Sequence, residues 1–122
     1  MKTILVVEDE VALQDALKQS FEGAGYTIMQ AFDGEEAATK LTETKPDLVL
    51  LDLILPKKHG FDVLKEMKSN DTTKHIPVLV LTNLEESEDV MKSIELGARG
   101  YLIKANYALK EVLAKVKEVL GE

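Results

Sequence analysis

The chain has 122 residues, enough for one domain with a sizeable core. Its 22 acidic and 15 basic residues give a net charge of −7, which argues against direct nucleic-acid binding. The absence of cysteine excludes disulfides, thiolate metal sites and cysteine nucleophiles. The apolar runs are too short to cross a bilayer, and Met1 leads into a strand-like run without a signal-peptide pattern. We therefore expect a cytoplasmic protein without membrane contact.

Short apolar runs alternate with segments of helical spacing along the whole chain. Residues 4–7 form a β-branched run typical of a strand buried on both faces. A helix is predicted over 10–22, followed by a less uniformly apolar strand over 26–31 that we place nearer the sheet edge. The later predicted elements are a helix from Asp33-Gly34 to before Pro46, a strand over 47–51, a helix carrying Phe61, Leu64 and Met67, a strand over 78–81, a helix over 86–96, a strand over 101–103 and a helix over 107–120.

This order amounts to five βα units in series, which implies an α/β fold with a parallel sheet covered by helices on both faces. No linker or repeat interrupts the pattern, so residues 1–122 are expected to form a single domain. Met29, Met67 and Met91 are assigned to core positions. In such sheets, ligands bind outside the carboxyl ends of the strands, where the strand order reverses.

Polar residues follow four of the predicted strands directly. The first strand is followed by Glu8 and Asp9, the third by Asp52, the fourth by Thr82 and the fifth by Lys104. A single polar residue at a strand end is common, but the whole set at one sheet edge indicates a site. Three carboxylates, one hydroxyl and one amine are therefore expected to lie together.

The chemistry of this set is coherent. Close carboxylates at Glu8, Asp9 and Asp52 repel one another unless a cation or a proton compensates. Without Cys or His at these strand ends, all-oxygen ligation favours a hard divalent ion, Mg²⁺. Asp52 could then act as a carboxylate nucleophile towards a phosphoryl group. Thr82 can donate a hydrogen bond to a phosphoryl oxygen, and Lys104 can pair with the carboxylate and then with the phosphate.

With these motifs the chain resembles the receiver domain of two-component response regulators, the family of the chemotaxis response regulator. The resemblance implies a flavodoxin-like, doubly wound sheet of five strands and five helices with strand order 2-1-3-4-5. It covers nearly the whole chain. The segments that carry it are ILVVEDE (4–10), PDLVLLDLILP (46–56), His59-Gly60, IPVLVLT (76–82) and GARGYLIK (97–104).

The resemblance implies a phosphorylation-dependent signalling switch rather than an enzyme. In this family Asp52 would accept a phosphoryl group from a sensor histidine kinase or a histidine phosphotransfer protein. The acidic pair Glu8 and Asp9, together with Asp52 and the backbone carbonyl of Ile54, would bind Mg²⁺, with Asp9 the more direct ligand of the pair.

The resemblance also implies how the signal leaves the domain. Thr82 and Tyr101 match the family's switch pair, in which the hydroxyl moves towards the phosphate and the aromatic ring turns inward. The readout surface would be the fourth helix, the fifth strand and the fifth helix. It would act on an effector protein or output domain, or through a homodimer that forms on phosphorylation.

Several positions depart from the family pattern or bear on the lifetime of the phosphoryl group. Many members have a cis-proline after the lysine, but here Ala105 follows Lys104. A cis bond before a non-proline residue costs about 2.5–4 kcal/mol, so we expect trans geometry or visible strain. Asn83 stands where a very small residue is usual, and Ile54 and Leu84 are apolar at positions that can steer water. These residues predict slow loss of the phosphoryl group.

Three alternatives compete with this interpretation. A phosphatase or phosphotransferase of the haloacid-dehalogenase type needs a second Asp two positions after the nucleophile, where this chain has Ile54. A flavin or nucleotide binder needs a Gly- or hydroxyl-rich loop after the first strand, where the chain has Glu8-Asp9-Glu10. A non-phosphorylated pseudo-receiver usually lacks one of the acidic, Asp or Lys positions, and all are present here.

Overall fold

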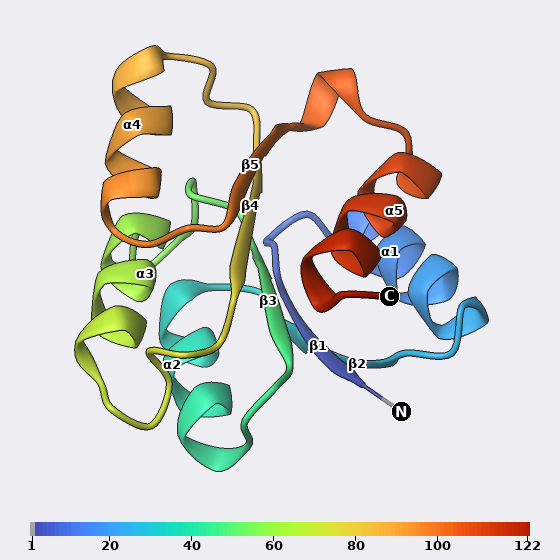
Figure 1. The fold of residues 1–122 in the computed structure, drawn as a ribbon, viewed down its shortest axis with the longest axis horizontal. Coiled ribbons are helices and arrows are strands. Elements are labelled where there is room, and N and C mark those ends of the chain that lie inside the picture. The colour runs from blue at the N-terminus through green and yellow to red at the C-terminus, as the bar shows by residue number, and fades with distance from the viewer. Residues whose placement is uncertain (1) are drawn as a thin grey trace.

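The computed structural model describes residues 2–122 and contains one parallel sheet with helices on both faces (Figure 1). The strand order is β2-β1-β3-β4-β5, so the predicted fold class and order are confirmed. None of the described helices is long and apolar enough to cross a membrane. The elements are β1 (Thr3–Val7), α1 (Val11–Gly23), β2 (Thr27–Ala31), α2 (Gly34–Glu43), β3 (Leu48–Leu51), α3 (Gly60–Ser69), β4 (Val78–Thr82), α4 (Ser87–Glu95), β5 (Gly100–Ile103), a 3₁₀ turn (Lys104–Asn106) and α5 (Leu109–Leu120).

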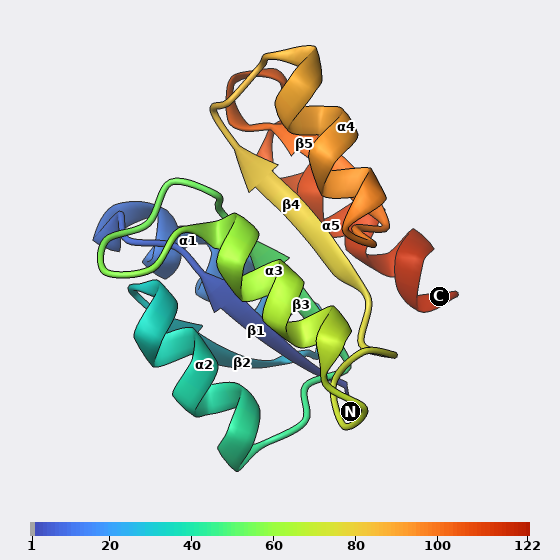
Figure 2. The same cartoon turned by 90° about the vertical axis from the view of Figure 1, so that its left-hand side faces the viewer.

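The sheet separates two apolar cores. Helices α2, α3 and α4 lie on one side of the sheet and α1 and α5 on the other, as the two views show together (Figures 1 and 2). In β1, Leu5 and Val7 pack into the core beside α2 and α3, whereas Ile4 and Val6 pack into the core beside α1 and α5. Because successive side chains of a strand point to opposite faces, a strand covered on both sides is apolar throughout. This explains the uninterrupted run at residues 4–7.

The segment after β5 differs from the expectation. Lys104–Asn106 form a 3₁₀ turn that was not predicted, and α5 begins at Leu109 instead of at Tyr107, whose backbone is extended. The apolar periodicity of α5 continues back to Tyr107, so spacing alone placed the start too early. No peptide bond among the described residues is cis, in agreement with the trans geometry expected between Lys104 and Ala105.

The core assignment of Met91 is wrong. Its side chain is 62% exposed on α4, and Ile94 one turn further is also exposed. Helical spacing shows which side chains share a face, but it does not show whether another element covers that face.

Candidate functional site

The register between β1 and β3 brings two acidic residues to the same edge of the sheet. Val7 of β1 is aligned with Leu51 of β3, so the residues that follow them, Glu8 and Asp52, are neighbours. The backbone N–H of Asp52 donates to the Val7 carbonyl at 3.0 Å, and that of Glu8 donates to the Ala31 carbonyl at 3.0 Å. Backbone hydrogen bonds therefore fix both acidic residues just beyond the last paired residue of each strand.

The carboxylates of Glu8, Asp9 and Asp52 form one cluster. Each offers an oxygen that lies within 4.8 Å of the other two. Glu8 and Asp52 are only 3% and 5% exposed, whereas Asp9 is exposed to solvent. The cluster lines a hollow of about 410 Å³ together with Ile54 and Asn83. The acidic residues predicted from the sequence thus lie together. Ile54 and Asn83, which depart from the family pattern, border the same hollow.

Lys104 connects the two buried carboxylates. Its ammonium nitrogen lies 2.5 Å from Glu8 Oε1 and 2.8 Å from Asp52 Oδ2. Burial alone would lower the pKa of Lys104, but hydrogen bonds to Asp52 and Glu8 and their negative charges outweigh it and raise this pKa above its usual value. Lys104 therefore stays protonated and holds the carboxyl ends of β1, β3 and β5 together.

Glu8 is a buried acid whose surroundings shift its pKa. Burial raises the pKa of its carboxyl group, and the negative charge of Asp52 adds to this rise. Hydrogen bonds from Lys104 and from the Glu10 backbone N–H act in the opposite direction without cancelling it. Additional positive charge near Glu8 would therefore favour its ionised form.

The predicted switch pair, Thr82 and Tyr101, meets at the loop after β4. Thr82 is the last residue of β4 and is fully buried, with its hydroxyl oxygen 3.5 Å from the Leu84 N–H. The Tyr101 hydroxyl donates to the Leu84 carbonyl at 2.8 Å. Burial, together with the charges of Asp89 and Asp52, raises the pKa of Tyr101 to about 12. Both side chains thus contact the backbone of Leu84 in the β4–α4 loop.

The turn after Asp52 is held by its own carboxylate. Asp52 Oδ1 accepts a hydrogen bond from the Ile54 N–H at 3.2 Å. The Ile54 side chain is 52% exposed beside the hollow, so it gives this edge an apolar surface. No acid or base occupies the position two residues after Asp52.

One residue that the sequence did not single out belongs to the framework of the site. Gln14 is completely buried, and its side-chain nitrogen donates to three backbone carbonyls around the acidic residues. Its spacing to Leu17 and Phe21 places it on the buried face of α1. A polar residue in phase with the apolar positions of an amphipathic helix was the signal that could have identified it.

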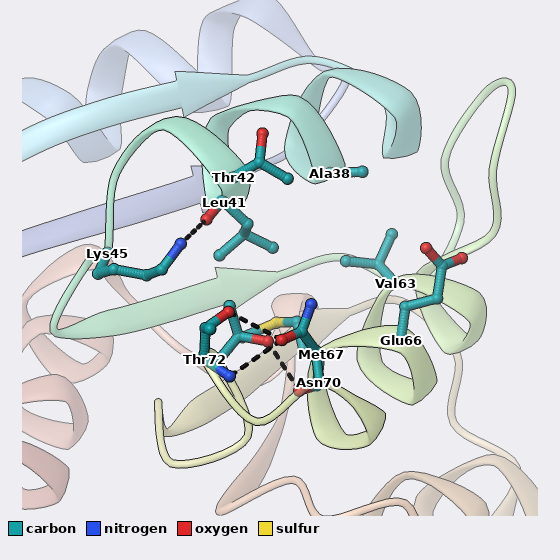
Figure 3. A pocket seen from close by; sticks show the side chains of 10 residues that line it. Ala38, Leu41, Thr42, Lys45, Val63, Glu66, Met67, Asn70 and Thr72 are labelled. Atoms are coloured by element: carbon teal, nitrogen blue, oxygen red, sulfur yellow. Dashed lines mark hydrogen bonds between the residues drawn. The ribbon is translucent and has the colours of Figure 1, made fainter.

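A second cavity of about 270 Å³ lies between α2 and α3 and offers different chemistry (Figure 3). Buried Leu41 and Met67 contribute to its wall. Its ammonium group, from Lys45, donates to the Leu41 carbonyl at 2.7 Å (Figure 3). Its one carboxylate, that of Glu66, pairs with Lys58. This cavity therefore lacks the grouped acidic side chains that distinguish the strand-end hollow.

The donor set at the strand ends fits a hard divalent cation. Carboxylate and carbonyl oxygens are the preferred ligands of Mg²⁺, which also keeps several waters and so needs few protein ligands. Asp9 is exposed and can reach an ion without further desolvation, while Glu8 and Asp52 are already grouped beside it. The coarse prediction of a metal-compatible acidic cluster is thus supported.

Comparison with known proteins agrees with this geometry. The family model described as the response regulator receiver domain matches residues 4–117. The chain belongs to the response regulator receiver domain family. This receiver domain is 38% identical to the DNA-binding dual master transcriptional regulator RpaA of Synechocystis over 120 residues, which cover 98% of the chain and 49% of RpaA.

Two further relatives support the assignment. The alkaline phosphatase synthesis transcriptional regulatory protein PhoP of Bacillus subtilis is 40% identical over 98% of the chain and 48% of PhoP. The receiver domain therefore spans about half the length of both regulators. The solved Mn²⁺-bound form of the response regulator Rcp1 is 35% identical, with a TM-score of 0.85 over 98% of this chain and 91% of that chain.

Proposed function

We propose that Asp52 is the phosphoacceptor of this receiver domain and that residues 1–122 act as one phosphorylation-dependent signalling unit. The observation that carries the proposal is the contact of Lys104 with both Asp52 and Glu8 inside the three-carboxylate cluster. A nucleophilic carboxylate next to a protonated lysine and other acids matches the chemistry of an aspartyl-phosphate site. The family membership supports the same assignment.

The proposed donor is a phosphohistidine on a sensor histidine kinase or a histidine phosphotransfer protein. A carboxylate oxygen of Asp52 forms the new O–P bond, the P–N bond of the phosphohistidine breaks, and the imidazole nitrogen keeps the electron pair. The Lys104 ammonium pairs with the carboxylate before transfer and with a phosphoryl oxygen after it. The Thr82 hydroxyl donates to another phosphoryl oxygen.

Mg²⁺ is the proposed cofactor, held by Glu8, Asp9, Asp52 and the backbone carbonyl of Ile54. When bound, the ion supplies positive charge that lets an anionic phosphoryl group approach the acidic cluster. The acidic cluster, and a relative whose solved form is described as Mn²⁺-bound, support this assignment.

The proposed output surface consists of α4, β5 and α5. Thr82 and Tyr101 would carry the signal there, because both already contact Leu84 in the loop that leads to α4. Exposed Met91 and Ile94 give α4 an apolar surface for a partner protein, an output domain or a second copy in a phosphorylation-dependent homodimer. The relatives named as transcriptional regulators are about twice as long as this chain, so DNA binding would fall to another part of such a protein. The cytoplasmic location stays a prediction.

The test is phosphorylation by a small-molecule phosphodonor in the presence of Mg²⁺, followed by intact-protein mass spectrometry. The parent should gain the mass of one phosphoryl group, and Asp52→Ala should gain none. Asp71→Ala is the matched control, because Asp71 is an exposed aspartate in the turn before β4 and should leave labelling unchanged. Equal labelling of the parent and Asp52→Ala would show that Asp52 is not the phosphoacceptor.

Two related expectations stay predictions. Loss of the phosphoryl group should be slow, because Ile54 and Asn83 border the hollow and neither can act as a base towards water. Decay of the phosphoprotein within seconds would contradict this. Turnover of a phosphomonoester would instead favour the phosphatase alternative over a signalling switch.

A further inference from the structure

The side-chain amide of Gln14 contacts the backbone of two strands and of residues 8–10, the acidic turn. Gln14 Nε2 lies 2.9 Å from the Val6 carbonyl, 3.1 Å from the Glu8 carbonyl and 2.9 Å from the Ala31 carbonyl. These carbonyls belong to β1, to the acidic turn and to the end of β2. One buried amide group thus ties together the three backbone segments on which the acidic pair depends.

The peptide groups of Glu8 are held on both sides. The Glu8 N–H donates to the Ala31 carbonyl at 3.0 Å, and the Glu8 carbonyl accepts from Gln14 Nε2. Because Gln14 Nε2 also donates to Ala31, the amide and the Glu8 N–H share one acceptor. A change at Gln14 therefore alters the support of the Glu8 backbone directly and through the end of β2.

The far side of the acidic turn is also attached to Gln14. The Gln14 backbone N–H donates to the Glu10 carbonyl at 3.0 Å, and the Glu10 N–H donates to Glu8 Oε2 at 2.9 Å. Asp9 lies between these two fixed residues. Its side chain is exposed, so the backbone of the turn determines the region in which its carboxylate lies.

Packing alone does not account for an amide at this position. Gln14 Oε1 is buried and has no hydrogen-bond partner among the described residues. Exchanging the amide oxygen and nitrogen would place an oxygen against three carbonyl oxygens, so the present orientation is the one that the surroundings require. An apolar side chain would fill the same volume without an unpaired oxygen, whose burial is unfavourable. The hydrogen bonds donated by the nitrogen are therefore the feature of Gln14 that an apolar side chain could not replace.

We propose that Gln14 is a positioning residue that sets the divalent-cation affinity of the acidic cluster by holding the acidic turn in place. This inference rests on the proposed function, since the cluster must bind a divalent ion. Hydrogen-bond partners that orient metal ligands typically change metal affinity about 10–100-fold when they are removed. Gln14 touches no ion itself and would act through the Glu8 and Asp9 backbone.

The decisive variant is Gln14→Met, which keeps the approximate length of the side chain and removes both donors. Thr73→Val is the matched control, because it removes a buried hydroxyl that donates to the Met67 carbonyl at 2.8 Å in the loop before the amino end of β4. For each protein, urea unfolding measures the free energy of unfolding. The electron paramagnetic resonance signal of free Mn²⁺, followed during a titration, gives the Kd for Mn²⁺. We expect Gln14→Met to weaken Mn²⁺ binding about tenfold, while Thr73→Val leaves the Kd unchanged at a comparable loss of stability.

The outcomes separate this inference from the proposed function. If the parent binds Mn²⁺ and Gln14→Met binds it equally well, the positioning role is wrong and the metal site stands. If the parent binds no Mn²⁺, the proposed metal site and the positioning role of Gln14 are both wrong. Should Gln14→Met fail to fold, Gln14→Asn keeps the amide but shortens it by one methylene, and a parent-like Kd in that folded variant overturns the inference.

Discussion

At the scale of single residues, negative charge outweighs positive charge around Asp52. The cluster groups three carboxylates, and one ammonium group contacts two of them, so formal negative charge is in excess by two. The raised pKa of Glu8 reflects the cost of burying this excess charge. A divalent cation would balance the formal charge and lower that cost, which is the physical basis of the proposed metal site.

Tyr101 provides a test of the link between β5 and the β4–α4 loop. Tyr101→Phe removes the hydrogen bond to the Leu84 carbonyl and should lower the free energy of unfolding by about 1 kcal/mol at neutral pH. The folded pKa is about 12, above the unfolded value of about 10. The folded state thus keeps a proton that the unfolded state loses, so this contribution is complete below pH ~10 and declines as the pH rises towards 12.

Urea unfolding of the parent and Tyr101→Phe at a series of pH values checks this prediction. The quantity to follow is the difference between the two proteins, because lysines and the other tyrosines titrate in both and cancel. The difference should shrink between about pH 10 and pH 12. A difference that stays constant over this range would show that the Tyr101 hydroxyl has no raised pKa.

At the scale of secondary-structure elements, the strands were predictable and the connections less so. The apolar run 78–81 placed β4 within a residue of its true end at Thr82, because a strand covered on both faces is mostly apolar. Parallel strands end at a common edge, so Asp52 and Lys104 could be brought together from sequence alone. The Lys104–Asn106 turn could not, because its hydrogen bonds leave no periodic signal in so few residues. A buried polar residue on the apolar face of α1 was a signal for Gln14, but the sequence does not show that three carbonyls from separate segments meet its amide.

The junction of β3 and α3 depends on the absence of a side chain at Gly60. A Cβ there would lie 2.5 Å from the Asp52 carbonyl oxygen and 2.5 Å from Leu53 Cα, and both atoms belong to the backbone. Gly60→Ala should therefore destabilise the fold by about 2 kcal/mol, within the range known for overpacked sites. Because the clash falls on the Asp52 peptide, phosphodonor labelling of the folded variant should also slow.

Gly23→Ala is the control for the Gly60 prediction. Nothing lies within 4 Å of a Cβ built at Gly23, the last residue of α1. Its replacement should be neutral or stabilise the protein by up to about 1 kcal/mol, since alanine reduces the freedom of the unfolded chain. The urea midpoints of Gly60→Ala and Gly23→Ala, each compared with that of the parent, measure the two effects. Equal shifts would show that the backbone around Gly60 accommodates a Cβ at little energetic cost.

At the scale of the whole molecule, the site exists only in the folded chain. Its parts come from three strand ends that are 44 residues or more apart along the sequence, at Glu8, Asp52 and Lys104. The unfolded chain keeps only Glu8 and Asp9 together and therefore binds a divalent ion weakly. Any ion that binds the assembled cluster must shift the folding equilibrium towards the folded state.

Mg²⁺ should accordingly raise the free energy of unfolding, by about 2.7 kcal/mol at a free concentration one hundred times its Kd. Urea unfolding with Mg²⁺, and with EDTA at an ionic strength matched by NaCl, separates site binding from general screening, which acts on all exposed charges. Asp9→Asn should remove most of the gain, because Asp9 is the exposed acid of the cluster and forms no ion pair with another described residue that its loss would disturb. Equal midpoints with Mg²⁺ and with EDTA would mean that the acidic cluster, although assembled by the fold, does not bind the ion.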